Sequence, residues 1–479
     1  MTLSSSLGRL ALSSGRLMVG GRFSRAIADL KHAESLSPDE LRARQEARLQ
    51  DLCSHAATTV PYWRDVFRER GLAPDSIRSL EDLQQLPLLD KEVVRSRPLE
   101  DFLSETAEPH RREPYTTSGS TGDPFRFVLD RAMAPIVYAS HLYFDSWFGI
   151  DPLDRYLRVA APPAPPQPLR EGTPLGARLR YRLRGRLQST YESLTQQRFS
   201  TFEADPERFR QAFDRFQPDY VMGYTGTLAL IARTLLDQGW RAKKPMKAII
   251  TIAENLTDDR REVLEECFRG PIANRYGQRE FKFWAAQSDP ANDTRAADPG
   301  RFRVVTELVV PETLDDDGAP CGDDSVGRLV MTSLHNRVMP FLRYDTKDMA
   351  SLVPSDGAGG RNLPSIERLD GRRQEILRLP CGKTIDPTTL GHFLFVVKGF
   401  VDRIRFYQLV ENDEENVTLK VVPTASFDET TEPALATALG DLLGPDLRIQ
   451  IERTDEIQLE KSGKRPIIKL RRPGTTSAS

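Results

Sequence analysis

The spacing of apolar positions near the start of the chain predicts an amphipathic helix over residues 38–56. Ser37 is a suitable N-cap residue, and Pro38 suits the first helical turn. Apolar side chains then recur at helical spacing and form a single stripe, which consists of Leu41, Leu49, Leu52, Cys53 and Ala56. The stripe predicts that the helix packs one face against a core.

Between residues 205 and 350 short apolar runs alternate with helical segments. The runs 219–223 and 247–253 are typical of buried strands, and the segments 226–238 and 257–268 that follow them have helical character. Alternation of strand and helix favours an α/β arrangement in which helices cover a sheet.

The pattern changes near residue 371. The remainder of the chain is predicted to contain strands over 403–410 and 417–422, a helix over 432–442 and a strand over 447–452. We therefore expect an α/β protein with two domains. A large N-terminal domain of layered sheets and helices would occupy residues 1–371, and a small α+β C-terminal domain would occupy residues 372–479.

Residues 116–122 form an unusual stretch in which every residue is Ser, Thr or Gly. Such a loop can bring backbone N–H groups and hydroxyls close to phosphate oxygens, but it lacks the spacing and the lysine of a Walker loop. Phe125, Phe127 and Leu129 alternate with other residues directly after it, which predicts a strand leaving the loop. A loop held by a rigid strand favours ligand binding over the alternative, a flexible connector.

The overall composition excludes several classes of protein. The chain has 479 residues, and its 67 Lys and Arg residues nearly balance 69 Asp and Glu residues, so that no basic field predicts nucleic-acid binding. No apolar run is long enough to span a membrane. The 4 cysteines are far apart in the sequence, which argues against a zinc site or a disulfide framework and favours reduced thiols in the cytoplasm.

Two segments do not fit either domain pattern. Residues 1–28 contain arginines and serines but no acid, and we interpret them as a frayed or loosely docked helix, with a targeting segment as the alternative. Residues 161–187 are rich in proline and then in arginine. They are expected to form an extended surface segment, whose charge could attract an anionic ligand.

Several short motifs occur in one order along the chain. In addition to the Ser/Thr/Gly loop, the motifs are residues 60–64, residues 80–91, Tyr276 to Glu280, Arg343 to Asp348, Asp370 to Glu375, and Lys461 to Lys464. In this order and at these separations they resemble the adenylate-forming (ANL) superfamily, in particular its phenylacetate–CoA ligase and CapK-like branch. At the position of Arg279 the CapK-like members often have Arg as well, whereas many other relatives have Thr or Ser.

The resemblance implies an ATP- and Mg²⁺-dependent ligase that activates a carboxylic acid as an acyl adenylate. The acyl group would pass to a thiol, with CoA as the expected acceptor, and AMP and pyrophosphate would be released. An amine or a carrier protein is an alternative acceptor. Two further alternatives are an adenylyltransferase and a nucleotide-binding protein without catalysis. A homodimer is compatible with all of these.

The same resemblance assigns the nucleotide site. Glu280 is expected to bind Mg²⁺, and Asp348 to accept hydrogen bonds from the ribose, with Arg372 supporting the same nucleotide. Tyr276 and Gly277 would lie beside the adenine, although a core tyrosine is a fair alternative for Tyr276. The cradle for the β- and γ-phosphates, with Thr117 also catalytic, would be Thr117, Ser118, Gly119, Ser120, Thr121 and Gly122.

The resemblance assigns the other roles as follows. Lys464 is expected to act in adenylation, with a solvated basic turn as the alternative. The small domain is expected to be mobile, with a hinge at Gln374 and Glu375, where Gln374 replaces an acidic residue of the family pattern. Apart from the resemblance, walls of the acyl pocket are expected at Tyr224, Ala253 and Glu254. The small residues Gly223 and Ala253 leave room for a flat or bulky group, so the substrate is expected to be an aryl or arylacetic acid, and contact of Glu254 with a substrate amino group is the alternative.

Overall fold

The structure is a computed structural model, and we describe it over a defined set of residues. These are 21–117, 125–160, 176, 185–186, 189–200, 205–254, 256–282, 284–288, 301–323, 325–355, 361–372, 377–379, 384–385, 390, 393–394, 398–413, 415–445, 447–458 and 466–471. Side chains of a few residues inside these ranges are not described.

The chain begins with a helical layer. Residues 21–33 are helical, and Phe23 and Leu30 are buried in the main core, so this part of the segment expected to be loosely docked is packed. The predicted helix over 38–56 is confirmed as α2 (Pro38–Thr59), and the Ser37 side chain accepts a hydrogen bond from the Glu40 N–H. The following elements are α3 (Pro61–Glu69), η1 (Glu81–Gln85), α4 (Lys91–Arg95), η2 (Leu99–Phe102) and η3 (Pro109–Arg111).

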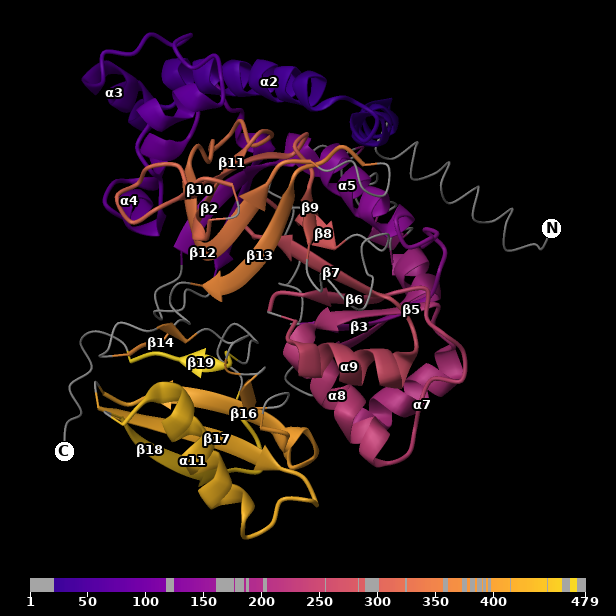
Figure 1. The fold of residues 1–479 in the computed structure, drawn as a ribbon. Coiled ribbons are helices and arrows are strands. Elements are labelled where there is room, and N and C mark those ends of the chain that lie inside the picture. Colours follow the sequence, from indigo (N-terminus) through magenta and orange to yellow (C-terminus); the bar gives the residue numbers. More distant parts are fainter. Residues whose placement is uncertain are drawn as a thin grey trace.

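An 11-stranded mixed sheet forms the centre of the molecule (Figure 1). Its parallel half consists of β3 (Tyr156–Ala160), β4 (Gln196–Ser200), β5 (Tyr220–Tyr224), β6 (Ile249–Ile252) and β7 (Ile272–Gly277). Its antiparallel half consists of β8 (Trp284–Ser288), β9 (Phe302–Val304), β10 (Val309–Leu314), β11 (Gly327–Ser333), β12 (Tyr344–Val353) and β13 (Ser365–Arg372). The predicted α/β arrangement is confirmed, with the expected strands at β5 and β6.

Helices cover both faces of the parallel half, which gives the layered arrangement in Figure 1. One face packs, through alternate strand residues such as Val221 and Ile249, against α7 (Pro206–Phe216), α8 (Thr225–Asp237) and α9 (Asp258–Phe268). The other face packs against α5 (Ala134–Ser146), which follows η4 (Arg131–Met133). Strands β3, β5, β6 and β7 therefore bury their side chains on two sides, as parallel strands usually do.

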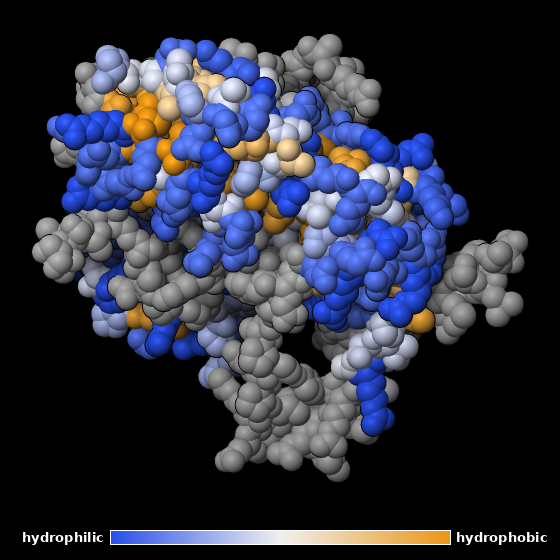
Figure 2. Space-filling model, turned by 90° about the horizontal axis from the view of Figure 1, so that it is seen from below, coloured by the Kyte–Doolittle hydropathy of each residue, from blue (hydrophilic) through white to orange (hydrophobic). Residues whose placement is uncertain are grey.

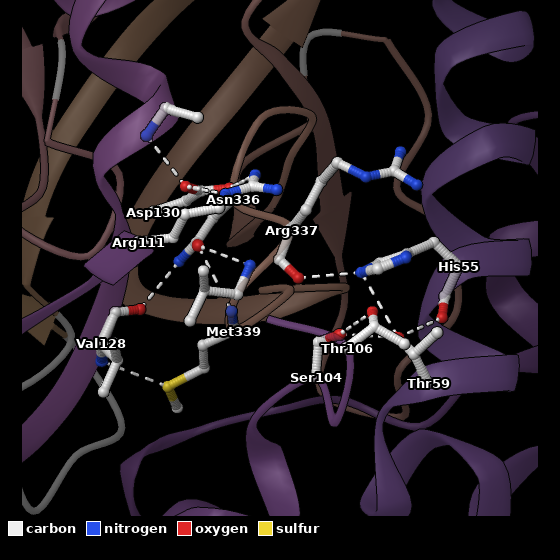
Figure 3. A network of polar contacts seen from close by, with 12 residues as sticks. His55, Thr59, Ser104, Thr106, Arg111, Val128, Asp130, Asn336, Arg337 and Met339 are labelled. Carbon is white, nitrogen blue, oxygen red and sulfur yellow. Dashed lines mark hydrogen bonds and ion pairs between the residues drawn. The ribbon is translucent and has the colours of Figure 1, made fainter. Parts of the chain in front are cut away.

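A separate hairpin consists of β1 (Arg112–Thr117) and β2 (Phe125–Asp130), and the predicted strand after the Ser/Thr/Gly loop is thereby confirmed. Polar contacts fix this hairpin to the rest of the large domain (Figure 3). Asn336 donates to the Val128 carbonyl at 3.0 Å, and the Val128 N–H lies 3.4 Å from the Met339 sulfur. Arg111 forms an ion pair with Asp130, the last residue of β2. The loop between the two strands therefore starts and ends on a braced support.

The C-terminal part contains a second core. A 4-stranded sheet has the order β18 (Arg448–Arg453), β17 (Asn416–Pro423), β16 (Ile404–Glu411) and β19 (Ile468–Lys469), and it packs with α11 (Thr431–Leu443). The smaller elements are β14 (Leu377–Arg378), β15 (Thr384–Ile385) and η10 (Phe400–Asp402). This confirms the small α+β unit and its elements. The domain boundary at residue 371 lies inside β13 and stays a prediction.

The small unit lies below the large sheet in Figure 1 and contacts the helices beneath that sheet. Arg405 of β16 forms an ion pair with Asp237 at the end of α8, at 3.2 Å. The Arg260 guanidinium of α9 lies 5.4 Å from the centre of the Phe406 ring. These contacts connect a strand of the small unit with two helices of the large one.

The described surface is mainly hydrophilic when viewed from below, with smaller apolar patches (Figure 2). Within the described ranges, no helix is both long and apolar enough to cross a membrane. Cys53, Cys267 and Cys321 are free thiols. Burial raises the pKa of Cys53 and of Cys267 to about 12, which keeps both thiols protonated. Most of the Pro- and Arg-rich segment 161–187 lies outside the described residues.

Candidate active site

The hairpin positions the two ends of the predicted phosphate loop. Thr117 is the last residue of β1 and pairs with Phe125, the first residue of β2. The two strands are antiparallel, so that residues 118–124 connect neighbouring strand ends. Thr117 is described here only by its backbone, and the other predicted cradle residues lie outside the described residues: Ser118, Gly119, Ser120, Thr121 and Gly122. The cradle assignment stays a prediction.

Tyr276 and Asp348 lie together although they are far apart in the sequence. The Tyr276 hydroxyl donates to Asp348 Oδ2 at 2.6 Å, and Gln278 Nε2 lies 3.1 Å from the same oxygen. Both residues are buried, at 8% and 7% exposure for Tyr276 and Asp348. Burial, together with the Asp348 carboxylate, raises the pKa of Tyr276 well above its usual value, so Tyr276 stays a proton donor.

This arrangement bears on the nucleotide assignments. The Tyr276 hydroxyl holds the carboxylate of Asp348, the predicted ribose-binding residue, in one orientation. Gly277 ends β7 next to Tyr276, and the backbone of Arg372 in β13 lies opposite Asp348 in β12. The structure therefore brings these predicted nucleotide residues together. Their contacts with a nucleotide stay predictions.

Glu280 is a buried carboxylate in the turn that follows β7. Its side chain is 5% exposed, and Tyr344 donates its hydroxyl hydrogen to Glu280 Oε1 at 2.9 Å. Lys91 Nζ lies 3.6 Å from the same oxygen. A carboxylate taken out of water needs such a cation and such a hydrogen bond, because an unpaired buried charge is costly. Its role as a Mg²⁺ ligand stays a prediction.

Lys91 is a site residue that the sequence did not assign, although it ends one of the quoted motifs. A parallel bridge joins Leu89 to Tyr344, which places α4 beside β12. The Lys91 ammonium also lies 5.5 Å from the centre of the Phe125 ring, at the base of the Ser/Thr/Gly loop. The only sequence feature that could have indicated Lys91 is its position after Leu-Leu-Asp in that motif. Its pairing with Glu280 is a long-range contact that no local sequence pattern shows.

We expect Lys91→Met to raise the KM for ATP roughly tenfold, since a charge-assisted contact contributes about 1.5 kcal/mol. The measurement is ATP–pyrophosphate exchange at varied ATP. Lys398→Met is a matched control, because Lys398 also pairs with a carboxylate, at 2.8 Å from Asp441, and lies over a ring, 5.3 Å from Phe393. An equal change in both variants would contradict a site role for Lys91.

The predicted walls of the acyl pocket lie at the carboxyl end of the parallel strands. Tyr224 ends β5, and Ala253 follows β6 with a left-handed backbone (φ 70°). Glu254 Oε2 accepts a hydrogen bond from the Gly226 N–H at 2.7 Å and lies 3.6 Å from Arg260. The carboxylate thus stabilises the N-terminus of α8. Its predicted contact with a substrate amino group stays a prediction.

Lys464, Gln374 and Glu375 lie outside the described residues. The chain becomes described again at residue 466, where the Pro466 carbonyl accepts a hydrogen bond from Gln408 of β16 at 2.9 Å. Pro466 is therefore anchored to the small sheet. The catalytic role of Lys464 and the hinge role of Gln374 and Glu375 stay predictions.

Known proteins resemble this chain in both sequence and fold. A family model described as the CapK C-terminal domain matches residues 381–471. A phenylacetate–coenzyme A ligase of Escherichia coli (strain K12) is 26% identical over 349 residues, which cover 72% of this chain and 74% of that protein. Protein CapK of Staphylococcus aureus is 22% identical over 395 residues, covering 82% of this chain and 80% of CapK.

A solved structure of a 2-hydroxyisobutyryl-CoA ligase in the postadenylation state has the same fold. It aligns with a TM-score of 0.72 at 18% identity and covers 92% of each chain. Residues 381–471 thus match the CapK C-terminal domain family, and the chain as a whole is similar in sequence to phenylacetate–CoA ligases and to CapK.

Proposed function

We propose that this protein is an ATP-dependent ligase that converts a carboxylic acid to an acyl adenylate and then to an acyl-CoA. The observation that carries the proposal is the pairing of Tyr276 with Asp348 next to buried Glu280, on the turn that follows β7. A hydrogen-bond acceptor for a ribose and a carboxylate for a hard cation would then stand side by side. The named relatives in the phenylacetate–CoA ligase branch support the same reaction.

The first half-reaction follows from the chemistry of a carboxylate. A substrate carboxylate oxygen attacks the α-phosphorus of ATP, the bond to the β-phosphate breaks, and pyrophosphate leaves. Asp348, oriented by Tyr276, would hold the ribose, and Lys464 would stabilise charge at the α-phosphate. Backbone N–H groups of the loop from Thr117 to Gly122 would hold the leaving phosphates.

Mg²⁺ fits the residues present at Glu280. Mg²⁺ is commonly bound by one or two carboxylates together with substrate phosphates, rather than by a cage of protein ligands. Within the described ranges, no three acidic, histidine or cysteine side chains gather to hold a metal, whereas one buried carboxylate lies beside the end of the phosphate-loop hairpin. When bound, Mg²⁺ would neutralise charge on the phosphates.

In the second half-reaction the CoA thiolate attacks the acyl carbon, and AMP leaves with its phosphate oxygen. An aryl or arylacetic acid is the proposed substrate, in agreement with the predicted walls Tyr224 and Ala253. The free thiols of the described residues support a reducing, cytoplasmic location. Amide synthesis and transfer to a carrier protein are alternative second half-reactions. A homodimer is compatible with each of them.

Product masses test the acceptor directly. The purified protein is incubated with ATP, Mg²⁺, a panel of acids and CoA, and the products are identified by mass spectrometry. An acyl-CoA together with AMP and pyrophosphate supports the proposal. AMP joined stably to an acceptor would instead establish an adenylyltransferase, and ATP binding without any product would establish a nucleotide-binding protein.

The proposed hinge gives a separate prediction. We expect Gln374→Pro to leave adenylation within about twofold of the wild type and to slow thioester formation about tenfold or more, because domain rotation needs backbone freedom at a few residues. The rates of the two steps are measured separately, by pyrophosphate exchange and by acyl-CoA formation. Gln374→Ala is the control and should preserve both steps. Equal losses in both steps of Gln374→Pro would contradict the hinge role.

A further inference from the structure

One face of β3 is half-exposed although β3 is an interior strand. Leu157 and Val159 are buried against the helices α7 to α9, but Tyr156, Arg158 and Ala160 are only partly buried. Strands β4 and β5 flank β3 on both sides, so the partial exposure does not arise at a sheet edge. It shows that the α5 side of β3 is incompletely covered along the length of the strand.

The same open face continues onto β5 and α5. Met222 and Tyr224 of β5 are partly buried and pack against the main core, to which α5 contributes, and Tyr138 of α5 is 44% exposed. Helix α5 is fixed over the sheet because Asp145 forms an ion pair with Arg275 of β7 at 2.6 Å. The face therefore has a rigid border and adjoins Tyr224, a predicted wall of the acyl pocket.

An aromatic pair forms one wall of this face. The Tyr156 and Tyr220 rings stack with centroids 4.7 Å apart and an interplanar angle of 10°. Burial raises the pKa of Tyr156; the guanidinium groups of Arg158 and Arg198 act to lower it, and the carboxylates of Asp145 and Glu192 act to raise it. A flat ring could pack on such a wall with cations at its edge.

The charges on this face do not balance. Arg198 is paired with Glu192 at 3.3 Å, and Arg275 is paired with Asp145. Arg158 lies between Arg198 of β4 and Met222 of β5 in the strand register. Among the residues that the structure describes, no carboxylate lies within ion-pair distance of Arg158. Among the described residues of this face, Arg158 is thus a positive charge without a paired carboxylate, and its side chain is partly buried.

A neutral acyl group would leave this guanidinium without a counter-ion, whereas an anionic one would form a charge-assisted and often bidentate contact with it. The carboxyl ends of parallel strands are also where α/β sheets commonly bind ligands. His141 of α5 adds a polar neighbour: burial and the charges of Arg275 and Arg158 lower its pKa, so that its imidazole is neutral and able to form hydrogen bonds.

We propose that the acid activated by this protein carries a second anionic group, in addition to the reacting carboxylate, and that Arg158 binds this second group. The inference rests on the proposed function and specifies its substrate class. The substrate would be an aromatic or similarly flat acid with a carboxylate, sulfonate or phosphate at the end remote from the reacting carboxylate. Arg158 would determine specificity and take no part in bond formation.

The test compares acids of one shape in pyrophosphate exchange: phenylacetate, its ring-carboxylated derivative and the corresponding uncharged carboxamide. We expect kcat/KM for the dianionic acid to exceed that of both others by roughly tenfold or more. Arg158→Met should remove this preference and leave exchange with phenylacetate within about threefold. Arg155→Met is the control, since Arg155 is exposed and donates to the Gln217 carbonyl at 2.9 Å.

The outcomes separate the inference from the function. Exchange that favours phenylacetate in the wild type, or a preference for the dianionic acid that Arg158→Met leaves unchanged, overturns the inference and leaves the ligase function intact. The comparison within the wild type stands even where Arg158→Met does not fold. Absence of exchange with every acid overturns both proposals.

Discussion

Replacing Glu280 with glutamine is expected to lower kcat/KM for carboxylate-dependent pyrophosphate exchange by on the order of 10²–10³-fold, the usual effect of losing a preorganised electrostatic group. Glutamine keeps the shape of the side chain and its contact with Tyr344, at 2.9 Å in the wild type, but loses the negative charge. Without that charge the proposed Mg²⁺ ligand set is weakened, so the apparent Mg²⁺ requirement should rise as well.

Tyr344→Phe is the graded control for Glu280→Gln. It removes one hydrogen bond to the carboxylate and keeps the charge, so we expect a loss of about tenfold or less. Exchange is measured across a Mg²⁺ titration, and thermal unfolding is followed in parallel. A Glu280→Gln protein that is folded and has wild-type Mg²⁺ dependence would contradict the assignment of Glu280.

Replacing Lys464 with alanine is expected to reduce adenylation by about 10³-fold while ATP binding is retained, because this cation would stabilise charge that develops only in the transition state. The segment around Lys464 precedes Pro466, whose carbonyl is bonded to Gln408 of the small sheet. Movement of the small domain would therefore bring Lys464 to the proposed nucleotide site. Rates of exchange and the Kd for ATP are measured on the same preparation.

Lys461→Ala is the matched control for Lys464→Ala. It removes the same charge from the same short segment, and we expect exchange to stay within about twofold of the wild type, as for a surface lysine. Equal losses for the two lysines would assign their effect to the general charge of the segment. A Lys464→Ala protein with full exchange would exclude Lys464 from adenylation.

Local patterns predicted the local elements well. The apolar stripe that includes Leu49 and Leu52 became the buried face of α2, and the alternation of Phe125, Phe127 and Leu129 became β2. The partner strand β1 was not predicted, because Arg112–Thr117 contains few apolar residues and no alternation. It is held by pairing with β2, which is a tertiary property that single-strand patterns do not contain.

The nucleotide site could be predicted in part. The motifs named Tyr276, Glu280 and Asp348, but not the hydrogen bond from Tyr276 to Asp348 or the contact of Lys91 with Glu280. Those contacts depend on where β7 and β12 lie in the mixed sheet and on the bridge that brings Leu89 to Tyr344. The partial exposure of Arg158 could also not be predicted from the sequence, because the exposure of a residue on an interior strand depends on how α5 covers that strand.

The most direct test of the central claim is carboxylate-dependent ATP–pyrophosphate exchange with the full chain, across aryl, fatty and amino acids. Exchange requires only the first half-reaction, so it does not depend on the acceptor. The account predicts exchange with at least one aromatic acid, dependent on Mg²⁺ and lost in Lys464→Ala. Measurable ATP binding without exchange for any acid would contradict acyl adenylation as the function of this protein.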